Sequence, residues 1–227
     1  NTLNTIISFV NSNSNFNTTT FSQVSHSHFR TLATSTDLSY ANSYMDSIRS
    51  ILYGLGRVKL VNELPTNVLF NDTYLSVRTH TTNPFSANVF TYNTTSITVP
   101  AVSFPSTKLG SIFLISKTNI YQTLQPVDTG ISMFTTLNLF DATSTNGTLV
   151  PYNSAITVTM PHTPVNTTTT EARCRYYNST ISNWDTSGCV ATHVSDTLIQ
   201  CTCPSLSSYM VESAVFIPPP PVFPYIR

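Results

Sequence analysis

The spacing of apolar residues predicts one long helix near the start of the chain. Apolar side chains recur there at steps of three and four, which places them on a single helical face. Ser35, Thr36 or Asp37 can cap the first turn, and Gly54 and Gly56 are expected to end the helix. We expect this face to pack on a hydrophobic core. Its members are Leu38, Ala41, Met45, Ile48, Leu52 and Leu55.

Beyond residue 58 the apolar period falls to two, which is typical of strands with one buried face. The segments are rich in β-branched and aromatic residues, and turn residues such as Asn83-Pro84 and Asn146-Gly147 separate them. Many short strands joined only by loops predict an antiparallel β-sandwich. The expected strands are 58–60, 68–70, 74–77, 87–90, 96–99, 111–115, 131–140 and 155–160, with a loosely alternating last strand over 207–216.

The predicted fold is therefore mainly β, with three parts along the chain. Residues 1–57 form a small helical subdomain, and residues 58–217 form the antiparallel β-sandwich. Residues 218–227 form a proline-rich linker, because prolines at 218–221 and 224 favour an extended spacer over a central strand or a helix. Such a run can also dock in an aromatic-lined groove, although a stiff spacer is its commoner use.

Composition narrows the classes of function. Ten basic and ten acidic residues give a formal net charge of zero, which argues against nucleic acid as a partner. Hydrophobic residues make up 40% of the chain, enough for a packed core, so the chain is not disordered. No apolar run approaches the ~18–20 residues that span a bilayer. The ends look cut from a longer chain, which leaves a membrane anchor in the parent protein open.

N-glycosylation sequons suggest a secreted chain, but their number decides nothing. Ser, Thr and Asn are so frequent that a similar number would arise by chance. Individual sequons in turns remain candidate glycan carriers. The candidates are Asn17, Asn71, Asn93, Asn146, Asn166 and Asn178.

All the cysteines lie in one short window near the end of the chain: Cys174, Cys189, Cys201 and Cys203. An even number of clustered cysteines in a Ser/Thr-rich chain favours two disulfides and an oxidising compartment. A four-thiolate zinc site is the alternative, but such sites use two close cysteine pairs and this window has one. We therefore expect disulfides and no metal or cofactor.

Residues 174–211 resemble the GPS motif, the last part of the GAIN domain in adhesion-type receptors and polycystin-family proteins. The resemblance lies in the order of four cysteines, Trp184 and Gly188. It implies the pairs Cys174–Cys201 and Cys189–Cys203, and it implies that Trp184 packs against these bridges. Gly188 is expected to adopt a backbone conformation that a Cβ would forbid.

In cleaving members of that family, His-Leu precedes a Thr or Ser whose hydroxyl attacks the carbonyl before it. The His takes the hydroxyl proton, and water hydrolyses the resulting ester. By this resemblance Leu206 precedes the bond, Ser207 is the nucleophile, and Ser205 stands at the position of the base. A serine is a very poor proton acceptor near neutral pH. We predict a vestigial cleavage site and an intact chain.

Another histidine could replace the missing base only if the fold brought it to Ser207. His193 lies between the second and third cysteines, and the others lie further away in sequence. We expect all of them to be structural or surface residues. They are His26, His28, His80 and His162.

These observations favour a non-cleaving GAIN-type module of a large cell-surface glycoprotein, acting as a rigid, force-transmitting spacer. Its expected partners are other extracellular domains of the same parent chain, or neighbouring surface proteins, besides its N-glycans. The alternative is a structural module of a secreted or surface-attached filament or coat. An enzyme acting on an external substrate is disfavoured, because the sequence shows no paired acid and base, no nucleophile elbow and no phosphate loop.

Overall fold

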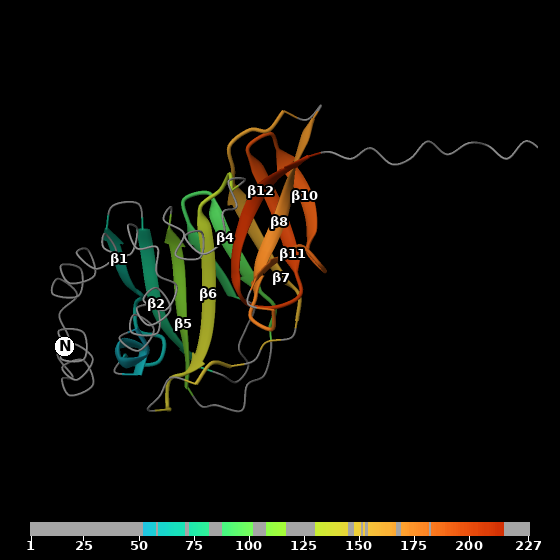
Figure 1. Cartoon of the computed structure of the whole chain (residues 1–227). Helices are drawn as coiled ribbons and strands as arrows, with labels where there is room; N and C mark the ends of the chain where they lie inside the picture. Colours follow the sequence, from blue (N-terminus) through green and yellow to red (C-terminus); the bar gives the residue numbers. More distant parts are fainter. Residues whose placement is uncertain are drawn as a thin grey trace, which may run out of the picture.

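The computed structural model shows a two-layer β-sandwich, as the strand pattern predicts (Figure 1). It describes residues 52–57, 59–70, 73–81, 88–101, 108–116, 130–144, 148–150, 152, 154–166, 169–181 and 183–215. The predictions for residues 1–51, for the linker 218–227 and for Asn71 and Asn146 lie outside this part. Within it, an antiparallel β fold with one short helix confirms the predicted fold class.

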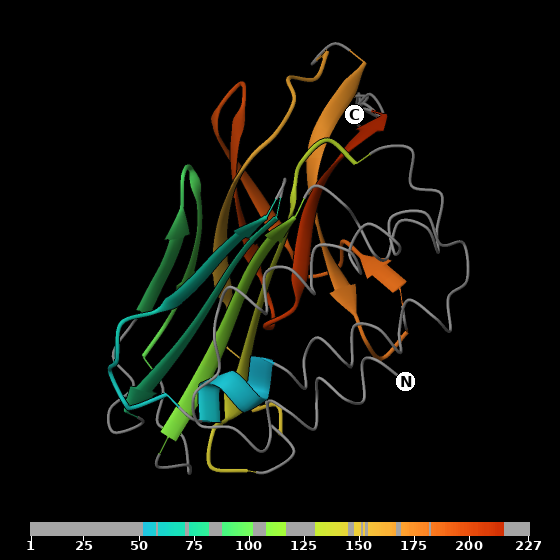
Figure 2. The same ribbon diagram turned by 90° about the vertical axis from the view of Figure 1, so that its left-hand side faces the viewer.

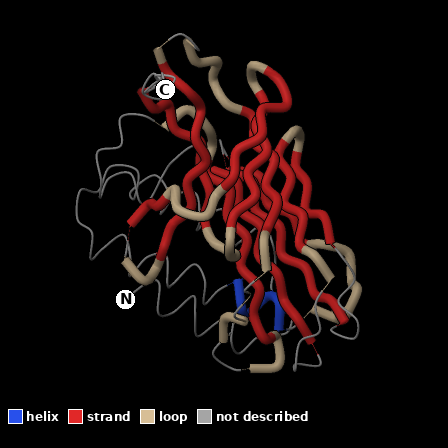
Figure 3. Tube along the Cα trace, turned by 90° about the vertical axis from the view of Figure 1, so that its right-hand side faces the viewer, coloured by secondary structure: helices blue, strands red, loops and turns tan. Residues whose placement is uncertain are grey.

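The described strands form one sheet of seven and one of five, all antiparallel. The larger sheet has, in spatial order, β1 (Thr66–Phe70), β2 (Thr73–Thr81), β5 (Lys108–Ser116), β6 (Phe134–Asp141), β12 (Ser208–Val215), β8 (Thr170–Asn178) and β9 (Asn183–Asp185). The smaller sheet has β10 (Val190–Ser195), β11 (Leu198–Cys203), β7 (Ile156–Pro161), β4 (Thr95–Val99) and β3 (Asn88–Tyr92). The views from the two sides show both layers (Figures 2 and 3).

The last strand, β12, lies inside the larger sheet and not at its edge. It pairs with β8 from Tyr209↔Tyr176 to Val215↔Thr170, and with β6 through Ser208↔Thr136 and Tyr209↔Thr135. Because both neighbours hydrogen-bond to it, β12 cannot leave without breaking ladders on two sides.

The core fills the space between the two sheets and follows the period-two alternation. Phe113 and Leu137 reach it from the larger sheet, and Ile97 and Val158 from the smaller one, all fully buried. Cys174, Cys201 and Cys203 belong to the same cluster. The central strands thus bury one face against the opposite sheet, as a sandwich requires, whereas the edge strand β10 is exposed.

The helix described from Leu52 to Arg57 lies on the outer face of the larger sheet (Figure 2). The ring of Phe140 lies between two glycines: a Cβ on Gly56 would come within 2.5 Å of it, and one on Gly110 within 2.1 Å. The expectation that Gly54 and Gly56 end the helix is wrong, since the helix runs through both. Gly56 is there because helix and sheet approach too closely for a side chain.

The predicted strand at 58–60 is also wrong in its described part. Lys59 lies in a bend just after the helix, where its N–H donates to the Leu55 carbonyl at 3.2 Å. Its buried ammonium contacts Glu63 Oε1 at 3.1 Å and Thr66 Oγ1 at 3.0 Å. These local contacts favour a turn over an extended strand.

No helix among the described residues is long and apolar enough to cross a membrane.

Candidate functional site

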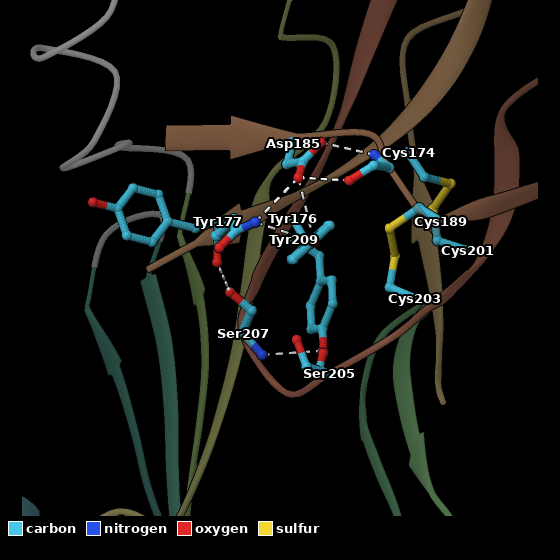
Figure 4. Close-up of a disulfide and its surroundings, with 12 residues drawn as sticks. Cys174, Tyr176, Tyr177, Asp185, Cys189, Cys201, Cys203, Ser205, Ser207 and Tyr209 are labelled. Carbon is cyan, nitrogen blue, oxygen red and sulfur yellow. Dashed lines mark hydrogen bonds between the residues drawn. A yellow bond between two sulfur atoms is a disulfide. The ribbon is translucent and has the colours of Figure 1, made fainter. Parts of the chain in front are cut away.

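The residues that the sequence predicts to be a vestigial cleavage site lie in the loop Pro204–Ser207, between β11 and β12. Just after it, the ring of Tyr209 is fully buried in the core, and its hydroxyl returns to the loop. That hydroxyl donates to the Ser205 carbonyl at 2.5 Å and accepts the Ser207 N–H at 3.1 Å (Figure 4). Burial raises the pKa of the Tyr209 hydroxyl, which keeps it protonated and able to donate. One buried phenol therefore fixes the backbone on both sides of Leu206.

The Ser207 hydroxyl is held by backbone. Its Oγ donates to the carbonyl of Tyr177 on β8 at 2.5 Å (Figure 4). A peptide carbonyl accepts a hydrogen bond but does not take the proton away near neutral pH. In addition, the Ser207 carbonyl accepts the Leu137 N–H at 3.3 Å, which attaches the loop to β6. The Ser207 hydroxyl is thus positioned by backbone, and the partner that it donates to is not a base.

The described histidines lie far from Ser207. His193 pairs with Ile199, four residues before Cys203 on β11, so it lies about 13 Å from the loop end of that strand. The backbone N–H of His162 donates to the Thr197 carbonyl, at the end of β11 that lies away from the loop. His26 and His28 fall outside the described residues.

His80 lies inside the sandwich, on β2 of the larger sheet. Its Nε2 lies 2.9 Å from Ser111 Oγ, and its ring packs edge-on to Phe90. On β5, His80 pairs with Leu109. The site lies beside Thr136 of β6, which is in register with Leu114 of β5, five residues further along that strand. That spacing is about 17 Å along the strand, too far for proton transfer to Ser207.

An open cleft lies at the end of the sandwich away from the loop. It has a volume of about 560 Å³ and is lined by His162, His193, Glu171 and Asp196, among others. Within the described residues no three His, Cys, Asp or Glu side chains are grouped to hold a metal ion.

Two disulfides hold β11, the strand that leads into the loop. Cys174 on β8 bonds to Cys201 on β11 and so joins the two sheets, with 5.8 Å between Cα atoms. Cys189, just before β10, bonds to Cys203 at the end of β11. These are the pairs that the family resemblance implies. All four sulfurs are in disulfides, so the zinc-site alternative does not apply.

Gly188 supports the loop from the side of the second disulfide. Its φ of +77° lies in the left-handed region, which a side chain disfavours. A Cβ there would make an ordinary van der Waals contact with the Pro204 ring at 3.4 Å, so the requirement for glycine comes from φ and not from lack of space. The observed backbone is of the kind expected for Gly188 from the sequence.

Trp184 does not pack against the disulfides, so that expectation is wrong. It is buried with Phe134, Met210 and Tyr177 in a separate cluster, and its ring centroid lies 5.8 Å from those of both Phe134 and Tyr177. The reason is alternation along β12: Tyr209 and Val211 point into the core, whereas Met210 points to the outer face, where Trp184 lies.

Three sequon asparagines lie in the described part. Asn93 and Asn166 are exposed. Asn178 is half-buried, and its Nδ2 donates to Asp185 Oδ2 at 3.1 Å. The structure thus distinguishes Asn178 from the two exposed sequon asparagines, whereas the sequence provided no basis for ranking them.

The fold is that of a known family. The family model for GAIN subdomain B matches residues 61–211, more than half of the 227 residues. The chain belongs to the GAIN subdomain B family. The resemblance of residues 174–211 to the GPS motif is therefore confirmed.

A solved structure shows the same fold. The full extracellular region of zebrafish Gpr126/Adgrg6 superposes with a TM-score of 0.56 at 12% identity, over 90% of this chain. This GAIN subdomain B chain spans 31% of that chain. No curated protein matches the sequence.

Sequence reasoning missed the two tyrosines that organise the loop. Tyr209 follows Ser207 by two residues, and Tyr177 lies thirty residues upstream, as its hydrogen bond with Ser207 records. Alternation along the last strand would have placed Tyr209 inward. Nothing local predicts that the Tyr177 carbonyl meets Ser207, because this contact depends on how β8 pairs with β12.

Proposed function

We propose that this GAIN subdomain B stays uncleaved and serves as a rigid, disulfide-locked extracellular module. It passes force or contact between neighbouring extracellular domains of its parent chain, or from them to a membrane anchor in the parent. The observation that carries the proposal is the Ser207 hydroxyl, which donates to the Tyr177 carbonyl while Ser205 occupies the place of the base.

The absence of an imidazole at position 205 should lower the rate of self-cleavage strongly. A positioned general base typically contributes ~10²–10⁴ in rate, and neither the Ser205 hydroxyl nor a carbonyl replaces it. The Tyr209 bridge adds a second obstacle, since it fixes the loop backbone on both sides of Leu206. The acyl shift requires the Ser207 oxygen to move onto the Leu206 carbonyl carbon. It must first give up its contact with Tyr177.

Load applied at the end of β12 enters the interior of the larger sheet. It is shared with β8 through the pairs from Tyr209 to Val215, and with β6 at Ser208 and Tyr209. In an uncleaved chain the load also passes through the 204–207 loop to β11, which Cys201 joins covalently to Cys174 on β8. This continuous covalent path is what a force-bearing spacer needs.

An extracellular location is part of the proposal. Two disulfides are stable in oxidising compartments and rare in the cytosol. The fold is also that of a receptor's extracellular region. Both observations support secretion or surface display.

Pulling on the two ends of single molecules tests this function. An uncleaved chain keeps its tether after β12 is stripped from the sheet. Reducing the disulfides then adds about 9 nm of contour length, because the 27-residue separation of Cys174 and Cys201 is released. Loss of the tether as soon as β12 separates would mean that the chain is cut, and would refute the proposal.

Assembly into a filament or coat is a second candidate, supported by β10. This edge strand is exposed along its whole length, with Val190 64% and Val194 56% accessible. Exposed edges favour pairing with another chain. Sedimentation at rising protein concentration tests it: a monomer throughout would exclude self-assembly through β10.

A further inference from the structure

We propose that Asn93 carries an N-linked oligosaccharide in the folded chain and that Asn178 does not. The inference rests on the proposed extracellular location, which would bring the chain past the oligosaccharide transferase. Both asparagines lie in the described part of the chain, and they contrast in accessibility: Asn93 is exposed, whereas Asn178 is half-buried and its side chain is hydrogen-bonded.

Asn93 lies at the tip of the β3–β4 hairpin, where Tyr92 pairs with Thr95 around a two-residue turn. Asn93 and Thr94 are both exposed. The φ of Asn93 is +51°, in the left-handed region that asparagine tolerates better than most residues. Because Asn93 is exposed at the tip of the hairpin, a large sugar attached to it can extend into solvent.

The third residue of this sequon gives the order of events. Thr95 opens β4 and is only 4% exposed once the hairpin has formed. A transferase needs that hydroxyl accessible, so attachment precedes closure of the hairpin. In the reaction Asn93 Nδ2 bonds to C1 of the first N-acetylglucosamine. The C1–O bond of a lipid diphosphate-linked donor breaks, the diphosphate leaves with the electron pair, and the amide loses one proton.

Asn178 is unsuited to a sugar because its amide is already occupied. Nδ2 donates to Asp185 Oδ2 at 3.1 Å and to the Tyr176 hydroxyl at 3.4 Å, which uses both hydrogens. Oδ1 accepts the Thr180 N–H at 3.0 Å. A glycosidic bond would replace one of those hydrogens with a sugar ring beside the buried Tyr176.

The Asp185 carboxylate connects the Asn178 amide to the turn before Gly188 through hydrogen bonds. It also accepts the Ser187 N–H at 2.8 Å and the Ser187 hydroxyl at 2.6 Å, in the turn that leads to Gly188. Asn178 itself pairs with Asn183 where β8 meets β9. Chains that received a sugar on Asn178 would therefore lose the β8–β9 pairing and are expected to be absent from the folded, secreted pool.

A sugar on Asn93 would have a structural consequence for the smaller sheet. Its hairpin includes β3, the edge strand of that sheet, and Val89 on β3 is 49% exposed. An exposed edge strand with apolar side chains can pair with a strand of another chain, and a large sugar at the end of the strand would hinder such pairing. The glycan would thus shield one edge and leave β10, at the opposite edge, bare.

Site-resolved mass spectrometry tests the inference. The full chain is secreted from a eukaryotic cell line behind an added signal peptide, and peptide-N-glycosidase converts each modified Asn to Asp. We expect Asn93 occupied in most molecules and Asn178 in almost none. N93G keeps the left-handed turn and should lose one glycan step on a gel, whereas N178Q should lose none.

Two outcomes overturn the inference in distinguishable ways. Bare Asn93, or occupied Asn178, in chains secreted with both disulfides formed would refute it and leave the proposed module intact. Chains that reach the medium with free thiols, or never reach it, would refute the extracellular location and the glycan together. The site map comes from the unmutated chain, so a variant that fails to fold does not change the result of the test.

Discussion

Replacing Tyr209 with Phe should destabilise the chain by about 2 kcal/mol. The ring stays in the core, where it is fully buried, so no cavity forms. What is lost is the hydroxyl that donates to Ser205 and accepts from Ser207. Each such hydrogen bond contributes ~1 kcal/mol net, and the two loop groups left without it are half-buried. Truncation to Ala would instead cost ~3–5 kcal/mol through the cavity.

The matched control is Tyr176→Phe. Tyr176 lies directly opposite Tyr209 in the β8–β12 ladder and is also buried, but its hydroxyl makes only long contacts of 3.4 Å, to Asp185 and Asn178. We expect this variant to lose less than ~0.5 kcal/mol.

Urea unfolding with both disulfides intact measures the difference. Y209F should lower the midpoint at an unchanged m-value, and it should lower the melting temperature by about 4–8 °C. Equal stability of Y209F, Y176F and the unmutated chain would show that the phenol does not hold the loop. A changed m-value would show instead that the compactness of one state had changed.

Three further changes follow from the structure. Gly188→Ala should cost about 1–2 kcal/mol, because the residue has a φ of +77°; an unchanged urea midpoint would refute the strain argument. The double change C174S/C201S should cost roughly 3.5 kcal/mol from the 27-residue loop alone, and a loss below ~1 kcal/mol by urea unfolding would show that the unfolded chain is already constrained. Burial, then the nearby Arg78, lowers the pKa of His80 to about 4 from 6.5. The unfolded state therefore takes up the proton first, and stability should fall by ~3 kcal/mol between about pH 6.5 and pH 4; H80N should flatten that slope.

The sequence predicted those parts of the fold that local pattern determines. Period-two alternation predicted the strands that carry the core residues Ile97 and Val158, and the resemblance to the GPS motif implied the two disulfides that the structure shows. The strand at 58–60 failed because alternation over three residues is too short to outweigh the local contacts of Lys59. Gly56 was misread because a glycine that ends a helix and one that admits a ring look alike in sequence.

The arrangement of the site depended on strand order, which sequence did not provide. The family resemblance placed Trp184 at the disulfides, yet β9 pairs at the edge of the larger sheet and Trp184 packs on its other face. The Tyr177 carbonyl reaches Ser207 only because β12 inserts between β6 and β8. Long-range pairing of this kind is set by the whole sheet and not by a local motif.

Intact-mass spectrometry of the secreted chain, reduced and deglycosylated, tests most directly whether this GAIN subdomain B cleaves itself. S207A, which lacks the nucleophile, is the matched control, and S205H, which returns an imidazole to the position of the base, should raise any cleavage. We predict one species at the full-length mass for both the unmutated chain and S207A. Two fragments from the unmutated chain alone, the second beginning at Ser207, would show that another group activates the hydroxyl and would contradict the proposed intact module.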